Sequence, residues 1–331
     1  SAGILVPLNA DTVVPMVGEE LWNKFVGEVE RHNAGEASAF TALNDNEKAA
    51  LVTAALAPEW LSPLPEYAPE EDREDARTRL AFQPMTAADI VQHVGEPVAI
   101  VAAPTRLEAR QALKAIEVDY EPLEPILDLS TAGRSEPLYS LELESGDAER
   151  QLKKAHLVVE ATYRTGHQEH IYIECQVVSA GWEADGTLVV EGSMQCPYFV
   201  HRSLVHGFGM PADSVVVKAT PVGGGFGGKE DFPSVIALHA ALLSKACGQP
   251  VRIAYDRHED IVGTTKRHPS MVTSRAAVDA DGRLQALEID VVLDGGAFRT
   301  LSPVVLSRAV LHAVGPYRCP NVHIRGRVLR T

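Results

Sequence analysis

A glycine-rich run at residues 223–228 carries the clearest chemical signal in this chain of 331 residues. Five of its six residues are glycine, so the backbone there can adopt positive φ and approach a ligand closely. The apolar stretch 215–220 before it indicates a strand, and Pro233 behind it suits the first turn of a helix. A glycine loop between a strand and a helix start presents backbone N–H groups to an anionic or oxygen-rich ligand.

Two phosphate-binding interpretations of this loop are open alternatives. A P-loop pattern runs from Gly223 to Lys229, but Glu230 stands where a serine or threonine would hold Mg²⁺. A dinucleotide fingerprint is matched by the glycines at 223, 225 and 228, and the stretch 251–256 could be the next strand, ending in an acid. The negative charge of Glu230 disfavours a pyrophosphate nearby. The alternative function is a dehydrogenase domain that binds NAD or FAD through residues 223–228.

The loop and other segments resemble the molybdenum hydroxylases, the xanthine dehydrogenase/aldehyde oxidase family, and they occur in that family's order. The segments are 167–174 (HQEHIYIE), 192–197 (GSMQCP), 222–230 (VGGGFGGKE), 256–260 (DRHED), 267–269 (RHP), 294–298 (DGGAF) and 315–322 (GPYRCPNV). Two further segments, 94–99 and 120–125, resemble the family's smaller α/β domain. The resemblance covers residues 85–331 and predicts the N-terminal portion of a molybdopterin-binding subunit.

The resemblance implies a mixed α/β (α+β) fold with two domains. Residues 1–130 would form a small α/β hammerhead-like domain with a helical acidic insertion at about 16–80. Residues 131–331 would form the N-terminal part of a molybdopterin-binding domain. Apolar periodicity predicts strands at 97–103, 116–120, 157–164, 176–182, 187–191, 215–220, 251–255, 271–278 and 284–293, and helices at 105–115, 199–207 and 234–247. The Asp-Gly pair within 279–282 predicts a hairpin turn.

The same resemblance implies that a molybdenum–pterin cofactor binds at the glycine loop. Its protein contacts would be Gln195, Gly224, Gly225, Phe226 and Gly227, with Gln195 and Phe226 beside the molybdenum but not bonded to it. In this family the sulfur atoms of the pterin hold the metal, so the protein has only to supply orienting donors and acceptors. The amide of Gln195 offers both, and the N–H groups of Phe226 and Gly227 offer donors.

Glu230 is the second predicted catalytic residue, beside Gln195. In the family, glutamate at this position resembles the purine-oxidising members, and its carboxylate would hydrogen-bond an N-heteroaromatic substrate. The implied reaction inserts a water-derived oxygen into a C–H bond of such a purine-like small molecule. The same carboxylate can also serve simply as a favourable charge at a helix N-terminus. We expect His167 and His170, with Glu169, to be structural residues on a strand.

The resemblance places the electron carriers on partner chains. The four cysteines have no C-x-x-C spacing, so we expect 2Fe–2S clusters on an iron–sulfur subunit and FAD on a flavin subunit. The family's F-R-G-F-G segment and its distant catalytic glutamate have no counterpart here, so either a second molybdopterin-subunit polypeptide would complete the active site or this chain is a fragment of a longer one. A non-catalytic scaffold subunit that keeps the fold without the metal is a further alternative.

Composition restricts the partners and the compartment. The formal net charge of −15 disfavours binding to nucleic acid or to an anionic membrane. We expect no membrane span, because no apolar run approaches the necessary ~18–20 residues. The first residues lack the basic region of a secretory signal, and scattered cysteines suit a reducing compartment, so we expect a cytoplasmic protein.

Overall fold

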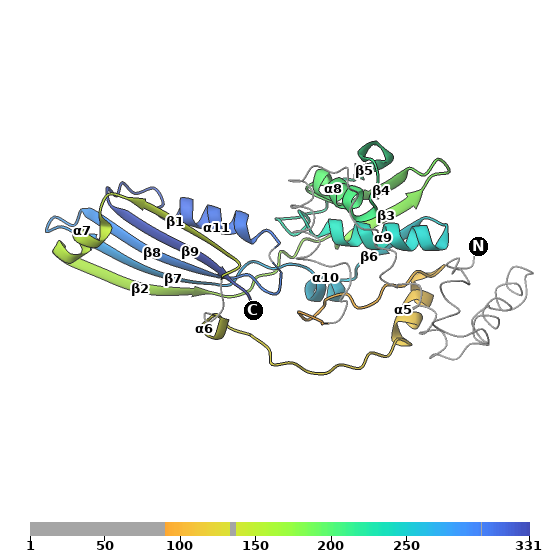
Figure 1. The fold of residues 1–331 in the computed structure, drawn as a ribbon, viewed down its shortest axis with the longest axis horizontal. Coiled ribbons are helices and arrows are strands. Elements are labelled where there is room, and N and C mark those ends of the chain that lie inside the picture. The colour runs from red at the N-terminus through yellow and green to blue at the C-terminus, as the bar shows by residue number, and fades with distance from the viewer. Residues whose placement is uncertain (1–89, 133–136, 299) are drawn as a thin grey trace, which may run out of the picture. The chain divides into compact units, whose positions relative to one another are not determined.

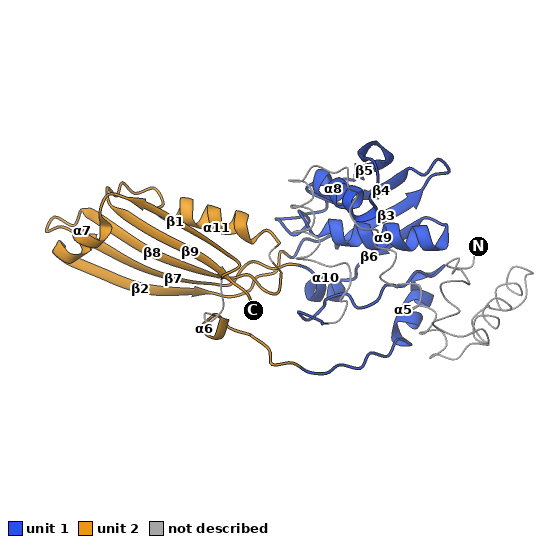
Figure 2. Cartoon of the chain, viewed as in Figure 1, with its two compact units in different colours: residues 1–122, 171–264 blue, residues 123–170, 265–331 orange. Residues whose placement is uncertain are grey.

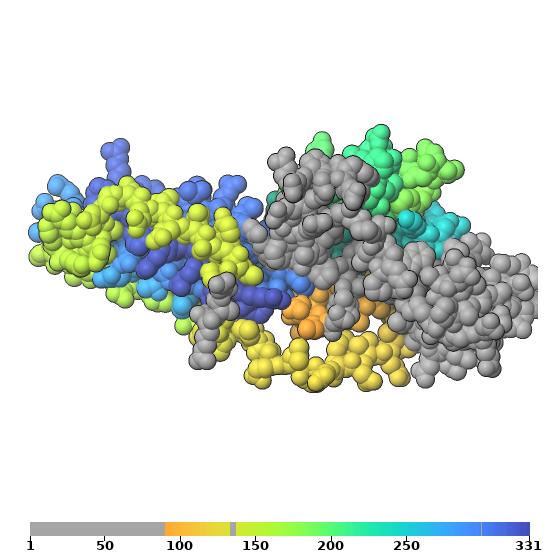
Figure 3. Space-filling model, viewed as in Figure 1, coloured from red at the N-terminus to blue at the C-terminus, as the bar shows by residue number. Residues whose placement is uncertain are grey.

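The computed structural model describes residues 90–132, 137–298 and 300–331. The chain forms two compact units (Figure 2), each made from two stretches of sequence. Unit 1 comprises Ser1–Pro122 and Ile171–Thr264, and unit 2 comprises Leu123–His170 and Thr265–Thr331. Figure 3 shows the described residues in space-filling form, coloured along the chain. Helices pack on mixed sheets in both units, so the mixed α/β fold predicted from the sequence is confirmed.

Unit 1 is built on a four-stranded sheet with the order β5-β4-β3-β6 (Figure 1). Its strands are β3 (Val177–Trp182), β4 (Leu188–Gly192), β5 (Val215–Ala219) and β6 (Val251–Ala254). β3 runs antiparallel to β4 and β6, whereas β4 and β5 are parallel. Parallel strands need a crossover connection, which α8 (Pro197–Phe208) and a short 3₁₀ turn (Ala212–Ser214) supply.

The central helix of unit 1 is α9 (Pro233–Cys247), which packs on β3 and against α8. Pro233 lies in its first turn, as predicted, and Gly248 ends it in the left-handed conformation with φ 63°. Eleven of its 15 residues are buried, as expected of a helix that is apolar on nearly every side. The glycine loop connects β5 to α9, so this core fixes both ends of the loop.

Two short helices of unit 1 begin with reciprocal capping boxes. Thr105 caps α5 (Arg106–Lys114), and Asp256 caps α10 (Arg257–Gly263). The helix predicted at 105–115 is therefore confirmed. The strands predicted at 97–103 and 116–120 are wrong, because neither stretch pairs with a strand among the described residues. Apolar alternation makes a strand only where a neighbour supplies backbone partners.

Unit 2 contains a five-stranded sheet with the order β1-β9-β8-β7-β2. Its strands are β1 (Tyr139–Ser145), β2 (Leu157–Thr165), β7 (Ser270–Val278), β8 (Leu284–Asp294) and β9 (Val322–Leu329). β8 and β9 are parallel, with α11 (Ser302–Leu311) as their crossover, and the other neighbours are antiparallel. The predicted hairpin turn joins β7 to β8, with Gly282 at φ 76°. Two small helices, α6 (Leu129–Ala132) and α7 (Ala148–Lys154), complete the unit.

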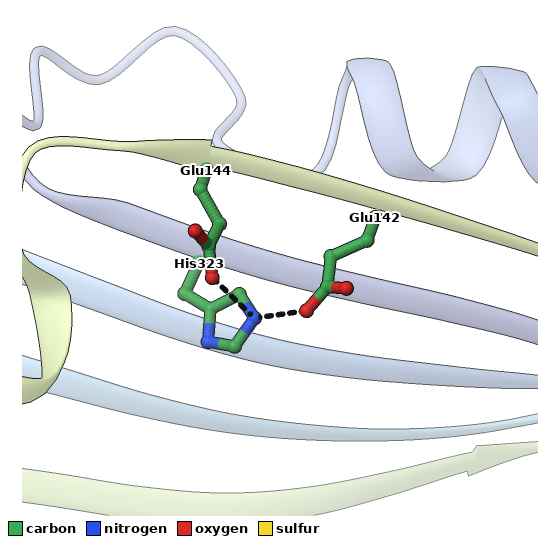
Figure 4. A group of neighbouring side chains, drawn as sticks. All are labelled: Glu142, Glu144 and His323. Carbon is green, nitrogen blue, oxygen red and sulfur yellow. Dashed lines mark hydrogen bonds and ion pairs between the residues drawn. The ribbon is translucent and has the colours of Figure 1, made fainter.

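The two faces of the unit 2 sheet differ in polarity. On one face α11 packs against β1 and β9, and Leu306 and Val310 join Ile324 in a buried core. The opposite face carries ion pairs between neighbouring strands, namely Glu160–Arg275, Arg275–Glu288, Glu288–Arg325 and Asp290–Arg327. At its edge Glu142 and Glu144 of β1 contact the ring of His323 (Figure 4). We interpret this last group as a surface ion pair, because the two carboxylates are 58% and 66% exposed.

The segment 167–174 was predicted as a strand, and this prediction is wrong. It is not paired into a sheet, and Ile171 has φ 48°, outside the range of a strand. The boundary between the two units falls inside the same segment. The insertion predicted at about 16–80 lies outside the described residues, and the domain boundary near residue 130 stays a prediction. Within the described part of the chain, no helix is long and apolar enough to cross a membrane.

Candidate functional site

Gln195 lies directly against the glycine loop, although 32 residues separate it from Gly227. It follows β4, and its backbone N–H donates to the Lys229 carbonyl at 2.7 Å. Its side-chain oxygen accepts from the backbone N–H groups of Gly227 (3.0 Å) and Lys229 (3.2 Å). Since both partners are donors, the oxygen must face the loop. The NH₂ group of Gln195 donates to no described residue and is available to a ligand.

The loop has a backbone that disfavours side chains. Gly224 and Gly227 both have φ 97°, and Phe226 has φ 53°. The left-handed conformation costs a residue with a Cβ atom roughly 1–2 kcal/mol. The Phe226 side chain is 76% exposed, so its own packing does not offset this cost. Backbone strain that the rest of the fold must maintain is typical of ligand-binding segments.

Three consecutive N–H groups of the loop, those of Gly224, Gly225 and Phe226, donate to no described residue. Successive N–H groups in such a turn form a concavity that binds anions or oxygen atoms. The Gly227 N–H, which the sequence suggested as a donor to the cofactor, is engaged by Gln195 instead. The donors that remain for a ligand are the three loop N–H groups and the Gln195 NH₂ group.

Close packing also requires glycine at two positions of the loop. A Cβ atom on Gly225 would lie 2.4 Å from the side-chain oxygen of Gln195. A Cβ atom on Gly223 would lie 2.5 Å from the Cβ atom of Glu174. Any larger residue would push the loop away from the two side chains that hold it in place.

Both ends of the loop are fastened to one atom, Oε2 of Glu174. This oxygen accepts from the Gly223 N–H at 2.8 Å, the Lys229 ammonium at 2.8 Å and the Ser193 hydroxyl at 2.6 Å. Lys229 is fully buried, and its ammonium also lies 4.8 Å from the centre of the Tyr172 ring. Burial alone would raise the pKa of Glu174, but hydrogen bonds from Lys229, Ser193 and Gly223 outweigh it and lower the pKa to about 2.

A second network of hydrogen bonds, which is buried, also contacts the loop. Gln176 donates to the Gly228 carbonyl at 2.7 Å and to the Tyr172 hydroxyl at 2.8 Å. The carboxylate of Asp260 accepts from the Tyr172 hydroxyl at 2.5 Å and from the Gln176 N–H at 2.8 Å. Burial and the hydrogen bond to Asp260 raise the pKa of Tyr172, so its hydroxyl remains a donor. Tyr172 and Glu174 of the segment 167–174 therefore meet the segments 192–197, 222–230 and 256–260 within unit 1.

Glu230 lies beside the residue that follows Gln195. The Cys196 thiol donates to its carboxylate at 3.9 Å, and the Glu230 N–H donates to the Gly227 carbonyl at 3.3 Å. Burial and then the charge of Glu230 raise the pKa of the Cys196 thiol. The thiol therefore stays protonated at neutral pH and is a poor nucleophile. The structure thus brings Gln195, the glycine loop and Glu230 together.

The sequence did not identify the residues that fix the loop through hydrogen bonds, namely Glu174, Gln176, Lys229 and Asp260. One signal was available for Lys229. It precedes the buried helix α9 by only a few residues, and an ionisable side chain carried into a core must find a partner there. Lys229 lies 55 residues from Glu174 in sequence, and Asp260 lies 88 residues from Tyr172, so spacing could not reveal these pairs.

Comparison with known families agrees with this geometry. A protein-family model described as "Molybdopterin cofactor-binding domain" matches residues 133–331, which is more than half of the chain. A second, described as "Aldehyde oxidase and xanthine dehydrogenase, a/b hammerhead domain", matches residues 67–124. The chain belongs to the molybdenum hydroxylase family.

Relatives of this molybdenum hydroxylase chain are longer than it is. A probable xanthine dehydrogenase subunit of Bacillus subtilis is 35% identical over 253 residues, which are 74% of this chain and 34% of that protein. The nicotinate dehydrogenase large molybdopterin subunit of Eubacterium barkeri is 32% identical over 258 residues, 75% of this chain and 60% of that one. The crystal structure of quinoline 2-oxidoreductase from Pseudomonas putida 86 matches with a TM-score of 0.70 and 27% identity, over 75% of this chain and 33% of that one. The chain therefore spans less than two thirds of each.

The residues at the loop fit the cofactor of the molybdenum hydroxylases. Such a cofactor brings its own metal ligands, so it requires N–H donors and close backbone approach from the protein. The loop and Gln195 offer both. The dinucleotide alternative fits less well, because its fingerprint belongs to a unit of two adjacent parallel strands. Here the loop follows β5, whereas the next strand, β6, lies at the opposite edge of the sheet and pairs with β3.

Proposed function

We propose that this chain is the molybdenum-cofactor-binding component of a hydroxylase. The enzyme would insert a water-derived oxygen into a C–H bond of an N-heteroaromatic, purine-like substrate. The contact between Gln195 and the glycine loop carries the proposal. The Gln195 oxygen engages the N–H groups of Gly227 and Lys229, while its NH₂ group and three loop N–H groups remain as donors on the same loop.

In that reaction this chain would bind and orient the cofactor. When bound, the molybdenum–pterin cofactor would supply the two-electron oxidation that side chains cannot perform. Gln195, Gly224, Gly225 and Phe226 are the residues that would hold it. Their donors are fixed by the fold before the ligand arrives, so they can stabilise developing negative charge without reorganising. The strained Phe226 backbone is part of this preorganisation.

Glu230 is the proposed substrate-binding residue. Within the described residues its carboxylate receives one long contact, from Cys196 at 3.9 Å, and so keeps capacity to accept from a ring N–H group. Purines and related azaheterocycles carry such groups, whereas simple aldehydes do not. Relatives named for xanthine, nicotinate and quinoline support this class of substrate.

The proposed assembly places 2Fe–2S clusters and FAD on partner chains, and the remainder of the active site outside these 331 residues. All four cysteines of the sequence are free thiols. This supports the reducing, cytoplasmic compartment expected from the sequence, and it leaves electron transfer beyond the molybdenum to partners.

Cofactor analysis of the complex purified with its natural partners tests the proposal. We expect stoichiometric molybdenum and pterin. Bound nicotinamide without molybdenum would support the dinucleotide alternative, and the absence of both would support a scaffold. In the metal-loaded complex, Gln195→Ala should lower turnover about 10²–10³-fold, as loss of one oriented donor does elsewhere. The matched control is Gln249→Ala, an exposed glutamine of the same unit, with no expected effect.

The substrate class is tested with Glu230→Ala. Activity on hypoxanthine should fall far more than activity on benzaldehyde, because only the purine loses a polar partner; factors of up to ~10⁴ are known for such losses. Glu191→Ala, an exposed glutamate of β4, serves as control. Equal losses on both substrates would show that Glu230 does not select the substrate.

A further inference from the structure

A buried charge lies directly beneath the glycine loop. Lys229 has no exposed surface, and its ammonium contacts Glu174 Oε2 at 2.8 Å and Ser193 Oγ at 3.0 Å. The Glu174 side chain is 36% exposed, so the cost of desolvation falls mainly on Lys229, and an apolar residue of similar volume often holds a fold together equally well. A role in packing alone therefore does not account for a lysine at this position.

The arrangement of donors around Glu174 indicates what the charge does. One carboxylate oxygen binds the N–H group of Gly223, where the loop begins, and the ammonium of Lys229, where the loop ends. The Glu174 N–H also donates to the Gly223 carbonyl at 3.2 Å. These contacts close the loop into a ring whose free N–H groups lie between the two fastened ends.

We propose that Glu174 and Lys229 form a latch that closes the glycine loop and presets the N–H groups of Gly224, Gly225 and Phe226 for the cofactor. The nature of the ligand rests on the proposed function. The two latch residues are positioning residues, since they act through the backbone of the loop.

The latch is needed because the loop has a strained backbone conformation. Phe226 at φ 53° would relax to a negative φ if either end of the loop were released, and its N–H group would turn with it. Holding that conformation requires a constraint at each end. A neutral hydrogen bond would supply a weaker one, because hydrogen bonds between charged groups are roughly twice as strong. Loss of groups that orient a metal site from outside typically costs about 10–100-fold in affinity.

The test uses the intact complex and four proteins. These are the wild type, Lys229→Met, the triple variant Glu174→Leu/Ser193→Ala/Lys229→Met, and the control Lys218→Met. Lys229→Met alone leaves the Glu174 carboxylate without its cation and can destabilise unit 1. The triple variant removes all three polar partners together, which keeps the core apolar and the unit folded. Lys218 is an exposed lysine of β5 in the same unit.

Two measurements are made on each protein. The first is hydrogen–deuterium exchange of the Gly223, Gly227 and Lys229 amides, with β3 and α9 as internal references. The second is the rate of molybdenum loss under dilution. For the triple variant we expect wild-type exchange in β3 and α9, but loop exchange and molybdenum loss about 10–100-fold faster. The control should match the wild type in every measurement.

Wild-type loop exchange together with wild-type molybdenum retention in the triple variant would overturn the latch. If β3 and α9 also exchange faster, unit 1 has unfolded, and Glu174→Gln becomes the deciding variant. It keeps an acceptor for the Gly223 N–H, so the latch predicts intermediate loop exchange, and wild-type exchange would overturn it. A wild-type complex without molybdenum would refute the proposed function, while the exchange data would still decide whether the latch exists.

Discussion

The two units differ in how far water reaches their charged side chains. In unit 1 two charged groups behind the glycine loop are almost inaccessible to water, Lys229 at 0% and Asp260 at 1% exposed, whereas the Glu174 side chain is 36% exposed. On the sheet of unit 2 the paired charges remain in contact with water, and Arg327 is 47% exposed. Both regions contain carboxylates at hydrogen-bonding distance from their partners. They differ in whether water can replace a partner that is lost.

Because of this difference, losing a partner should cost more free energy at the buried groups of unit 1 than at the exposed ion pairs of unit 2. A buried donor that loses its acceptor pays the full cost of desolvation. An exposed ion pair contributes about 0–1 kcal/mol, because water solvates each charge when its partner leaves. Substitutions in the two units should therefore differ in effect even where the geometry of the contacts is similar.

The largest effect is expected for Asp260→Ala in unit 1. It removes the acceptor of the Tyr172 hydroxyl and of the Gln176 N–H, and each unsatisfied buried donor costs about 1–3 kcal/mol. The free energy of unfolding of unit 1 should fall by about 2–4 kcal/mol, measured by hydrogen exchange of β3 and α10. The matched change in unit 2 is Asp290→Ala, which loses a pair with Arg327 and should cost less than about 1 kcal/mol. Equal costs would remove the contrast between the units.

A smaller effect is expected from acid. The pKa of Glu174 lies at about 2 in the folded chain, below its ordinary value of 4.5. Its interactions therefore stabilise the folded state fully above the ordinary value, and this contribution is lost as the pH falls from 4.5 toward 2. Urea unfolding of unit 1 across this interval should show a steeper loss of stability in the wild type than in Glu174→Gln. Parallel pH profiles would mean that Glu174 is not held as a carboxylate.

Phe226→Gly sharpens the comparison within unit 1. Glycine relieves the strain at φ 53° but adds backbone freedom to the unfolded chain, so stability should stay within about 1 kcal/mol of the wild type. Molybdenum retention by the complex should nevertheless fall, because the loop loses its preset conformation. Tyr198→Ala, which removes another exposed aromatic ring of unit 1, should change neither quantity. A large loss of stability in Phe226→Gly would mean that the ring packs in the assembled complex.

The smallest effect is expected at the edge of the unit 2 sheet. Glu142→Gln removes one of the two carboxylates at His323 and should change the free energy of unfolding by less than about 0.5 kcal/mol (Figure 4). The residual difference should vanish in 1 M salt, where the screening length is about 3 Å. A larger effect that resists salt would indicate a role beyond a surface ion pair.

Regular elements with buried faces were predictable from the sequence. β7, β8 and α9 carry long apolar patterns, and each lies within a few residues of its predicted range. The strand at 167–174 was expected from the resemblance to the family, and it is wrong because Ile171 has φ 48° and no strand pairs with this segment. β9 alternates, but Gly326 interrupts its apolar face where α11 packs, and it was not predicted.

The site was predictable only in part. Gln195 and the glycine loop were linked through their resemblance to a family, and the structure places them in contact. Glu174 and Asp260 could not be assigned, because their partners are distant in sequence and a carboxylate has no periodicity. Their roles follow from burial and donor geometry, which only the folded chain possesses. The Gly227 donor shows the same limit, since the sequence could not reveal that Gln195 would engage it.

The crossover between β4 and β5 has a consequence for how the protein matures. Gln195 follows β4 and the loop follows β5, so the two meet only after these parallel strands have paired around α8. Such non-local pairing is slow, because the connecting chain loses conformational entropy before favourable contacts form. The loop and Gln195 therefore come into contact only when these strands are paired. A chain in which the sheet is incomplete lacks the set of donors proposed to hold the cofactor.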